Sequence, residues 1–227
     1  MAIKAMMMGA AGLALAFAAG CGSSVDDDDG AGAGGTGGGG VCAGFADEAG
    51  AGTVTVRFRN DSMETIYLPA LCDSLDYTIE PAGGSDGVSY AFSGSCLQTC
   101  EDLQTESQIA CGACQQTTYQ LLPGATREVV WAGTGLQGGI EMPAACWESP
   151  ETGGTCGRVV AAPAGTYRAG ALGFGSCSGE CNCDAEGLCV GSATGLEAYH
   201  EPVSFAFPTA APVEVVFGVC TFGCGED

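Results

Sequence analysis

The chain has 227 residues and fifteen cysteines, and its 27 acidic residues against six basic ones give a formal net charge of −21. This charge argues against nucleic acid as a partner, because phosphates require basic contacts. It equally argues against a basic patch that would bind anionic lipid headgroups. An acidic surface serves solubility, and it can also bind cations or basic partners.

The first twenty residues are predicted to be an export signal. Lys4 is their only charged residue, and an apolar stretch follows over residues 5–19. Its length suits a secretory signal better than a membrane span, which needs about 20 apolar residues. The run Ala18-Ala19-Gly20-Cys21 resembles the lipobox of bacterial lipoproteins, with Ala18 in place of the usual leucine. An ordinary signal peptide that happens to reach a cysteine is the alternative.

The lipobox resemblance implies that signal peptidase II removes residues 1–20 and that Cys21 carries a diacylglycerol and an acylated amine. Two or three acyl chains are enough for stable anchoring in a membrane. Gly22 and Ser23 lack the aspartate that retains such lipoproteins at the inner membrane. The resemblance therefore implies an exported protein that lipid on Cys21 anchors to a membrane, at the outer membrane or cell surface.

Residues 21–40 are predicted to be an acidic, Gly-rich flexible linker, because they are too polar to bury a core. A linker of roughly 19 residues spans about 24 Å on average. The run Asp26–Asp29 could suggest calcium, but an EF-hand loop alternates its ligands and ends in glutamate. A solvated charge run is favoured. Without residues 1–20, which contain one lysine and no acid, the net charge is −22.

The cysteines beyond Cys21 number fourteen, which is an even set. In an exported chain they predict up to seven disulfides. They are Cys42, Cys72, Cys96, Cys100, Cys111, Cys114, Cys146, Cys156, Cys177, Cys181, Cys183, Cys189, Cys220 and Cys224. Metal or redox chemistry at the C-x-x-C of residues 111–114 is the alternative. That motif lacks a second pair at zinc-ribbon distance and the strand–helix context of a thioredoxin-type site, so no metal or cofactor is expected.

The full connectivity cannot be deduced from the sequence, but close neighbours restrict it. Cys181 and Cys183 are too close to pair with each other without strain. They are expected to reach elsewhere, to Cys177 and Cys189.

Two further pairings are suggested by position along the chain. Cys146 and Cys156 flank a turn rich in glycine and proline, so they could close one loop. Cys220 and Cys224 follow the last predicted strand and would pin the C-terminus.

Strand signals dominate residues 41–227, which are predicted to form one disulfide-rich domain. Val54, Val56 and Phe58 alternate with polar residues, and residues 213–219 repeat the pattern with Glu214 facing outward. Short strands separated by turn residues indicate a β-sandwich. Other strands are expected at residues 64–69, 75–80, 88–92, 118–122, 127–131, 165–174 and 202–207.

Two cysteine-dense insertions, residues 96–114 and 177–189, are interpreted as polar loops. Disulfides would order them, at typically about 2–4 kcal/mol each. Residues 95–116 are the nearest candidate for a short helix. Stapled loops on a rigid sandwich would also make a recognition surface.

Two short motifs suggest the type of sandwich. The segment Leu122-Pro123-Gly124 followed by residues 127–131, and the later segment of residues 163–168, resemble motifs of the intracellular proteinase inhibitor family. The resemblance covers roughly residues 53–217 and implies an immunoglobulin-like β-sandwich with Trp131 and Tyr167 in its core. Both cysteine-dense insertions lie outside the family pattern. Inhibition of extracellular or periplasmic proteases is therefore carried over only as an alternative function.

Catalytic signals are weak. His200 is the only histidine, and it lies between Glu197 and Glu201 in what is interpreted as a surface turn. A triad would need this histidine, yet no G-x-S-x-G motif occurs, and a blue-copper site would need two histidines. Paired carboxylates for glycoside hydrolysis stay open, although no pair is marked out. The Gly-rich tract lacks the lysine of a P-loop.

The sequence thus predicts a non-enzymatic, membrane-anchored lipoprotein whose β-sandwich binds a protein or envelope ligand or has a structural role in the envelope. The alternative is an inhibitor of extracellular or periplasmic proteases. A secreted hydrolase is the third and least favoured hypothesis.

Overall fold

The computed structural model describes residues 40–91, 97–108, 112–150, 153–198 and 201–218. These residues form an all-β fold, as predicted, with three short 3-10 helices: η1 (Ala43–Phe45), η2 (Asp102–Gln104) and η3 (Ala144–Cys146). None of their helices is long and apolar enough to cross a membrane. The predicted signal peptide, Cys21 and almost all of the predicted linker lie outside the described residues.

The first sheet has β1 (Val54–Asn60) at its centre. The last strand, β14 (Val213–Phe217), pairs with β1 in parallel, and β7 (Thr126–Trp131) pairs with it antiparallel. The expected alternation is confirmed in both β1 and β14, where every second side chain is buried. On the solvent face of this sheet, Arg57 forms ion pairs with Glu128 and Glu214 on the two neighbouring strands.

The second sheet has β10 (Gly165–Gly170) between β13 (Val203–Phe207) and β4 (Thr78–Pro81), and both pairings are antiparallel. Its aromatic residues face the first sheet. The Trp131 ring of β7 lies 4.8 Å from the ring of Phe207 and 5.4 Å from that of Tyr167. The two sheets therefore pack face to face, as in a sandwich, and Trp131 and Tyr167 are buried in the core as expected.

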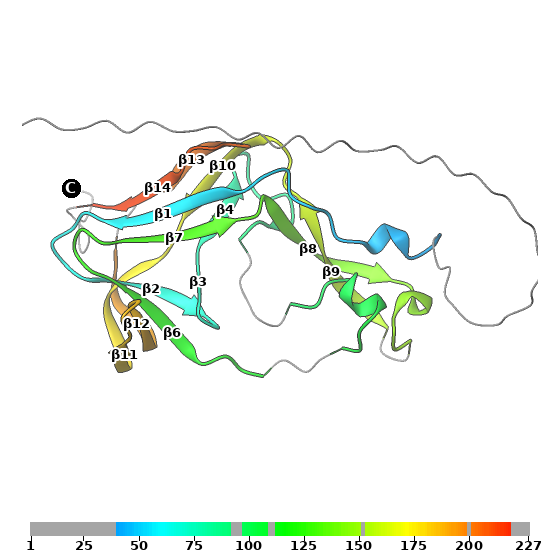
Figure 1. Cartoon of the computed structure of the whole chain (residues 1–227), viewed down its shortest axis with the longest axis horizontal. Helices are drawn as coiled ribbons and strands as arrows, with labels where there is room; N and C mark the ends of the chain where they lie inside the picture. The colour runs from blue at the N-terminus through cyan, green and yellow to red at the C-terminus, as the bar shows by residue number, and fades with distance from the viewer. Residues whose placement is uncertain (1–39, 92–96, 109–111, 151–152, 199–200, 219–227) are drawn as a thin grey trace, which may run out of the picture. The chain divides into compact units, whose positions relative to one another are not determined.

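The third sheet contains the two longest strands of the fold. β11 (Gly173–Cys183) and β12 (Leu188–Ala198) form a hairpin. They belong to the same sheet as β6 (Gln116–Leu121) and β2 (Ile66–Leu71) (Figure 1). The short strand β3 (Ser74–Leu75) pairs antiparallel with β2 at the end of this sheet. β12 pairs with β6, and β11 pairs back to β2 through Phe174 and Tyr67. The four strands thus close a ring.

The fourth sheet is a long ribbon of β8 (Thr134–Met142) and β9 (Gly154–Ala161), with β5 (Val88–Ser89) paired to β8. One end of β8 begins beside the aromatic core, where the Trp131 indole donates to the Thr134 carbonyl at 2.8 Å. The other end enters a second, separate cluster of buried residues. This disulfide cluster consists of Cys100, Leu103, Met142, Cys146, Trp147 and Cys156.

The outer edge of β9 is covered by the segment that leads into the domain. The Asp47 and Glu48 carboxylates accept hydrogen bonds from the backbone amides of Val159 and Ala161, at 2.8 and 2.9 Å. Glu48 also forms an ion pair with Arg158 at 3.2 Å. Carboxylates that occupy the amides of an edge strand prevent another strand from pairing there.

Several expectations are refined here. The single strand expected at residues 75–80 is two strands, β3 and β4, which lie in different sheets and are separated by residues 76–77. The segment at residues 177–189 is not a polar loop, because most of it belongs to the β11–β12 hairpin. The single strand expected at residues 165–174 is two strands in different sheets, which separate at residues 171–172. The short helix considered within residues 95–116 is, in the described part of that segment, the single 3-10 turn η2, whose Leu103 is buried in the disulfide cluster.

Candidate binding pocket

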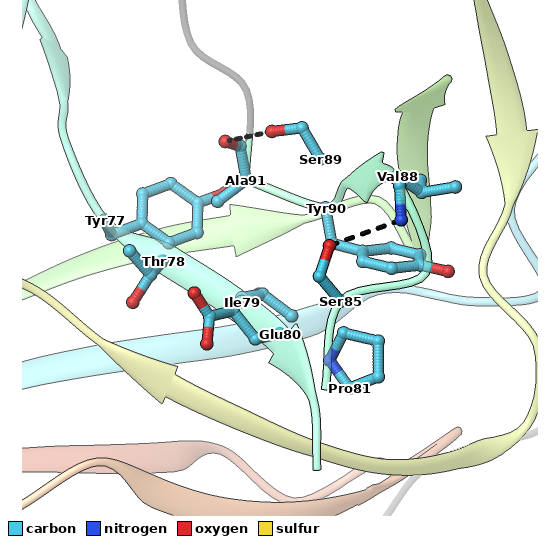
Figure 2. A pocket seen from close by; sticks show the side chains of 11 residues that line it. Tyr77, Thr78, Ile79, Glu80, Pro81, Ser85, Val88, Ser89, Tyr90 and Ala91 are labelled. Carbon is cyan, nitrogen blue, oxygen red and sulfur yellow. Dashed lines mark hydrogen bonds between the residues drawn. The ribbon is translucent and has the colours of Figure 1, made fainter. Parts of the chain in front are cut away.

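A depression of about 410 Å³ lies between β4 and the segment of residues 85–91 (Figure 2). Its two walls come from different sheets, since β4 belongs to the second sheet and β5 to the fourth. The lining residues are Tyr77, Thr78, Ile79, Glu80, Pro81, Ser85, Gly87, Val88, Ser89, Tyr90 and Ala91. Binding sites for small ligands in proteins commonly have volumes of about 300–1,000 Å³.

The connection between the two walls is a tight turn that its own side chains hold. The Gly84 amide donates to the Pro81 carbonyl at 3.1 Å. The Ser85 hydroxyl accepts from the Gly87 amide, and the Asp86 carboxylate accepts from the Val88 amide, at 3.3 and 3.1 Å (Figure 2 shows the first). Such local bonds from Ser and Asp to the backbone favour turns. The sequence between the walls therefore preorganises the pocket.

Tyr90 connects the pocket to the aromatic core. Its side chain is buried, and its ring makes edge contacts with Trp131 and Tyr167. Its hydroxyl donates to the Asp86 carboxylate at 2.7 Å. Burial and this bond raise the pKa of Tyr90 well above its usual range, and the same bond lowers the pKa of Asp86. The floor of the pocket is thus fixed by packing and by one charge-assisted hydrogen bond.

Tyr77 and Glu80 supply the ring and the carboxylate that line one wall of the pocket. Tyr77 is half-buried against Phe58, with a ring separation of 6.3 Å, and burial raises the pKa of its hydroxyl. Glu80 is exposed and lies opposite Arg168 in the β4–β10 register. In the view of Figure 2, the side chains of Ile79 and Glu80 lie below the Tyr77 ring, and the Tyr90 ring lies to their right. The pocket therefore combines an aromatic wall with a carboxylate.

A second feature of the surface is a bulge in the β11–β12 hairpin. Ser178 pairs with Ser192 and Asn182 with Val190, so three residues of β11 protrude opposite Gly191. The Cys177–Cys181 disulfide closes the base of this stapled bulge, residues 177–181. Gly191 suits this position, because it has a positive φ angle and a side chain on it would collide with the Ser178 carbonyl and pack tightly against both sulfur atoms of the disulfide.

The predicted disulfide cysteines pair in five bridges within the described residues. The pairs are Cys42–Cys146, Cys72–Cys114, Cys100–Cys156, Cys177–Cys181 and Cys183–Cys189. Cys181 and Cys183 thus reach Cys177 and Cys189, as the spacing predicted. Cys96, Cys111, Cys220, Cys224 and the candidate His200 lie outside the described residues.

The expected loop closure between Cys146 and Cys156 is wrong. Cys146 lies in η3 and bonds to Cys42, while Cys156 lies in β9 and bonds to Cys100. Both bridges enter the disulfide cluster from separate segments, so each joins parts of the chain that are far apart in sequence.

Among the described residues, no group of three or more His, Cys, Asp or Glu side chains could hold a metal ion.

The pocket itself was not anticipated from the sequence. Its walls fall within the predicted strands at residues 75–80 and 88–92, but no motif indicates that they meet around a cavity. The nearest signal is the turn chemistry of residues 81–87, where Gly84 and Gly87 adopt positive φ angles. Comparisons with protein-family models, curated proteins and solved structures gave no significant match to this chain.

Proposed function

We propose that this chain is an exported lipoprotein, anchored through Cys21, whose β-domain is a non-enzymatic binding module. The observation that carries the binding role is the pocket between Tyr77 and Tyr90, which is preorganised by a turn and by the aromatic core. Five disulfides in the described residues fit an oxidising, extracytoplasmic compartment.

The proposed domain type is immunoglobulin-like. Two three-stranded sheets pack face to face, and Trp131 and Tyr167, from the two motif segments, contact each other between them. These features support the resemblance to the proteinase inhibitor family at the level of the fold. Function in such sandwiches resides in loops and pockets on the scaffold rather than in the scaffold itself.

Anchoring is tested by Cys21→Ser in the full chain. We expect the variant to lose incorporation of labelled fatty acid and to move from the membrane fraction to the soluble fraction, because no lipid attachment site remains. The control is Cys72→Ser, which removes a different cysteine and leaves the lipobox intact. Membrane retention of Cys21→Ser equal to the wild type would contradict the proposed anchor.

Binding is tested by chemical crosslinking of the full-length protein in its native envelope. Three forms are compared: the wild type, the pocket variant Tyr77→Leu with Glu80→Gln, and the surface control Glu197→Gln on β12. We expect a crosslinked component that the wild type and the control share and the pocket variant loses. Equal crosslinking of all three forms would remove the pocket from the proposed function.

Protease inhibition is the second candidate, and the stapled bulge favours it. Its central residues, Ser178, Gly179 and Glu180, are exposed, and the Cys177–Cys181 disulfide fixes the base of the loop. A rigid loop loses little conformational entropy when it binds in a protease cleft. The test is inhibition of a panel of serine, cysteine and metalloproteases, with Glu180→Ala as the loop variant. Absence of inhibition across the panel would eliminate this candidate.

A further inference from the structure

We infer that the Tyr77 pocket binds an organic cation, an ammonium or guanidinium group, against Glu80 and the Tyr77 ring. This inference rests on the proposed binding function and specifies the chemistry of its ligand. Four observations carry it: an exposed carboxylate that forms no ion pair among the described residues, a partly exposed aromatic ring, a cavity of suitable size and the charge of the whole domain.

The carboxylate of Glu80 is available to a ligand. It is exposed, and among the described residues it forms no ion pair within 4.0 Å. The nearest cation in the register is Arg168 on the adjacent strand β10. Because Arg168 is also exposed, an ion pair between Arg168 and Glu80 would be weak. A ligand cation would compete with Arg168 for the same carboxylate.

The aromatic wall suits a cation as well. A cation over the face of a tyrosine is attracted by the quadrupole of the ring, and quaternary ammonium groups are recognised in this way. The structure contains one such pair already, in which the Arg127 guanidinium lies 3.8 Å from the centroid of the Tyr119 ring. No corresponding cation–ring pair involves Tyr77 among the described residues. Its ring is held in place from behind by Phe58.

The size of the pocket limits the ligand. A depression of about 410 Å³ accommodates one basic side chain or a small alkylammonium ion. Residues of the turn, from Ser85 to Gly87, close one side of it by their own hydrogen bonds. The partly exposed side chains of Val88 and Ala91 line the pocket above the buried Tyr90 ring and would contact the methylene groups of the ligand.

The domain also attracts cations from a distance. After removal of the signal the net charge is −22, and the remaining basic residues are five arginines. Arg57, Arg59 and Arg158 are occupied in ion pairs with carboxylates. A summed negative field of this kind raises the local concentration of cations and the rate at which they associate.

The first experiment measures binding by NMR chemical-shift titration of the full-length Cys21→Ser protein. The probes are Nα-acetyl-arginine amide, its neutral isostere Nα-acetyl-citrulline amide, and tetramethylammonium. We expect the arginine derivative to bind at least fivefold more tightly than the citrulline derivative at low salt, and to weaken as salt rises. Stronger binding of the arginine derivative would indicate a basic side chain as the natural ligand, and stronger binding of tetramethylammonium a small quaternary amine. Equal binding of the arginine and citrulline derivatives would overturn the inference.

The second experiment compares variants of the pocket with the same probes. Glu80→Gln should weaken binding of the cation about fivefold, which corresponds to about 1 kcal/mol, while Glu197→Gln leaves it unchanged. Arg168→Gln should strengthen binding about twofold, because it removes the competing cation. Tyr77→Leu should weaken binding, whereas Tyr77→Phe retains it because the ring remains. Unchanged binding in Glu80→Gln would overturn the inference.

The two proposals fail in different ways. If Glu80→Gln loses the cation but the full chain still crosslinks its envelope component, the cation site stands and the pocket does not account for the binding function. If the wild type binds no probe cation but its crosslinking depends on the pocket, the binding function stands and the cation chemistry is wrong.

Discussion

The larger aromatic core and the disulfide cluster are stabilised by different means. No cysteine lies among the buried residues of the larger core in the part of the chain that the structure describes, and five aromatic side chains contact one another there. The disulfide cluster contains only Leu103, Met142 and Trp147 besides its buried cysteines. Burial of apolar area supports the first region, and covalent links compensate for the small apolar area of the second.

Each region contains one of the two tryptophans of the chain, which allows the comparison to be measured. Trp131 lies in the larger core and Trp147 in the disulfide cluster. Trp147→Phe therefore leaves a fluorescence reporter of the core, and Trp131→Phe leaves a reporter of the disulfide cluster. The two regions unfold together only if both reporters give the same transition.

The largest effect is expected from Trp131→Ala. The indole is buried, contacts the rings of Tyr90, Tyr167 and Phe207, and donates a hydrogen bond to the Thr134 carbonyl. Its removal should lower the free energy of unfolding by about 4 kcal/mol through the cavity that it leaves. Urea denaturation followed by circular dichroism measures this loss, and a loss below about 1 kcal/mol would mean that the core is not the main source of stability.

An intermediate effect is expected from replacing Cys100 and Cys156 together by alanine. Their bridge joins residues 56 apart in sequence, and loss of such a link costs about 2–4 kcal/mol. The Trp147 reporter should become exposed to solvent well before the Trp131 reporter does. If both reporters shift equally, the disulfide cluster is not an independent cooperative unit.

The smallest effect is expected from Tyr90→Phe, and it depends on pH. The Asp86–Tyr90 bond contributes about 1 kcal/mol at neutral pH, because the carboxylate is exposed. The pKa of Asp86 is lowered in the folded state, so this contribution is present above about pH 4 and is lost as the pH falls through the folded value. The pKa of Tyr90 is raised, so the wild type loses stability as the pH rises above about 10.

Thermal unfolding of the wild type and Tyr90→Phe across the pH range tests this. The advantage of the wild type should be largest between about pH 4 and pH 10 and should shrink on both sides. A constant difference at all pH values would show that the variant acts through packing alone.

The strands that the sequence predicted most clearly are those with alternating apolar residues. β1 and β14 have this alternation and lie where expected. β8, β9 and β12 were missed, because they are rich in glycine and expose much of both faces, so no period of two is visible. Gly157 in β9 illustrates the reason, since a side chain there would meet Leu136 on β8 at 2.8 Å. The Leu136 side chain occupies the space beside Gly157, and glycine at such a position contributes nothing to an alternating pattern.

The candidate pocket could not be predicted for a related reason. Tyr77 and Glu80 are visible in the sequence only as residues of a short strand, and Tyr90 as a residue of another. They approach each other because β4 pairs with β10 while β5 pairs with β8. Both pairings are long-range, and one involves a strand without alternation.

The disulfides inside the β11–β12 hairpin could be anticipated because their partners are neighbours in sequence, whereas the bridges of the disulfide cluster depend on the same long-range pairings.

The Cys42–Cys146 bridge also constrains the order in which the protein can mature. A polypeptide that emerges from its N-terminus into an oxidising compartment presents Cys42 more than one hundred residues before its partner, whereas Cys177 meets Cys181 four residues later. In that interval Cys72 and Cys100 become available to Cys42 as incorrect partners. Maturation therefore depends on keeping Cys42 reduced or on thiol–disulfide exchange that corrects early pairs. Yield should accordingly respond more to a disulfide isomerase than to added oxidant.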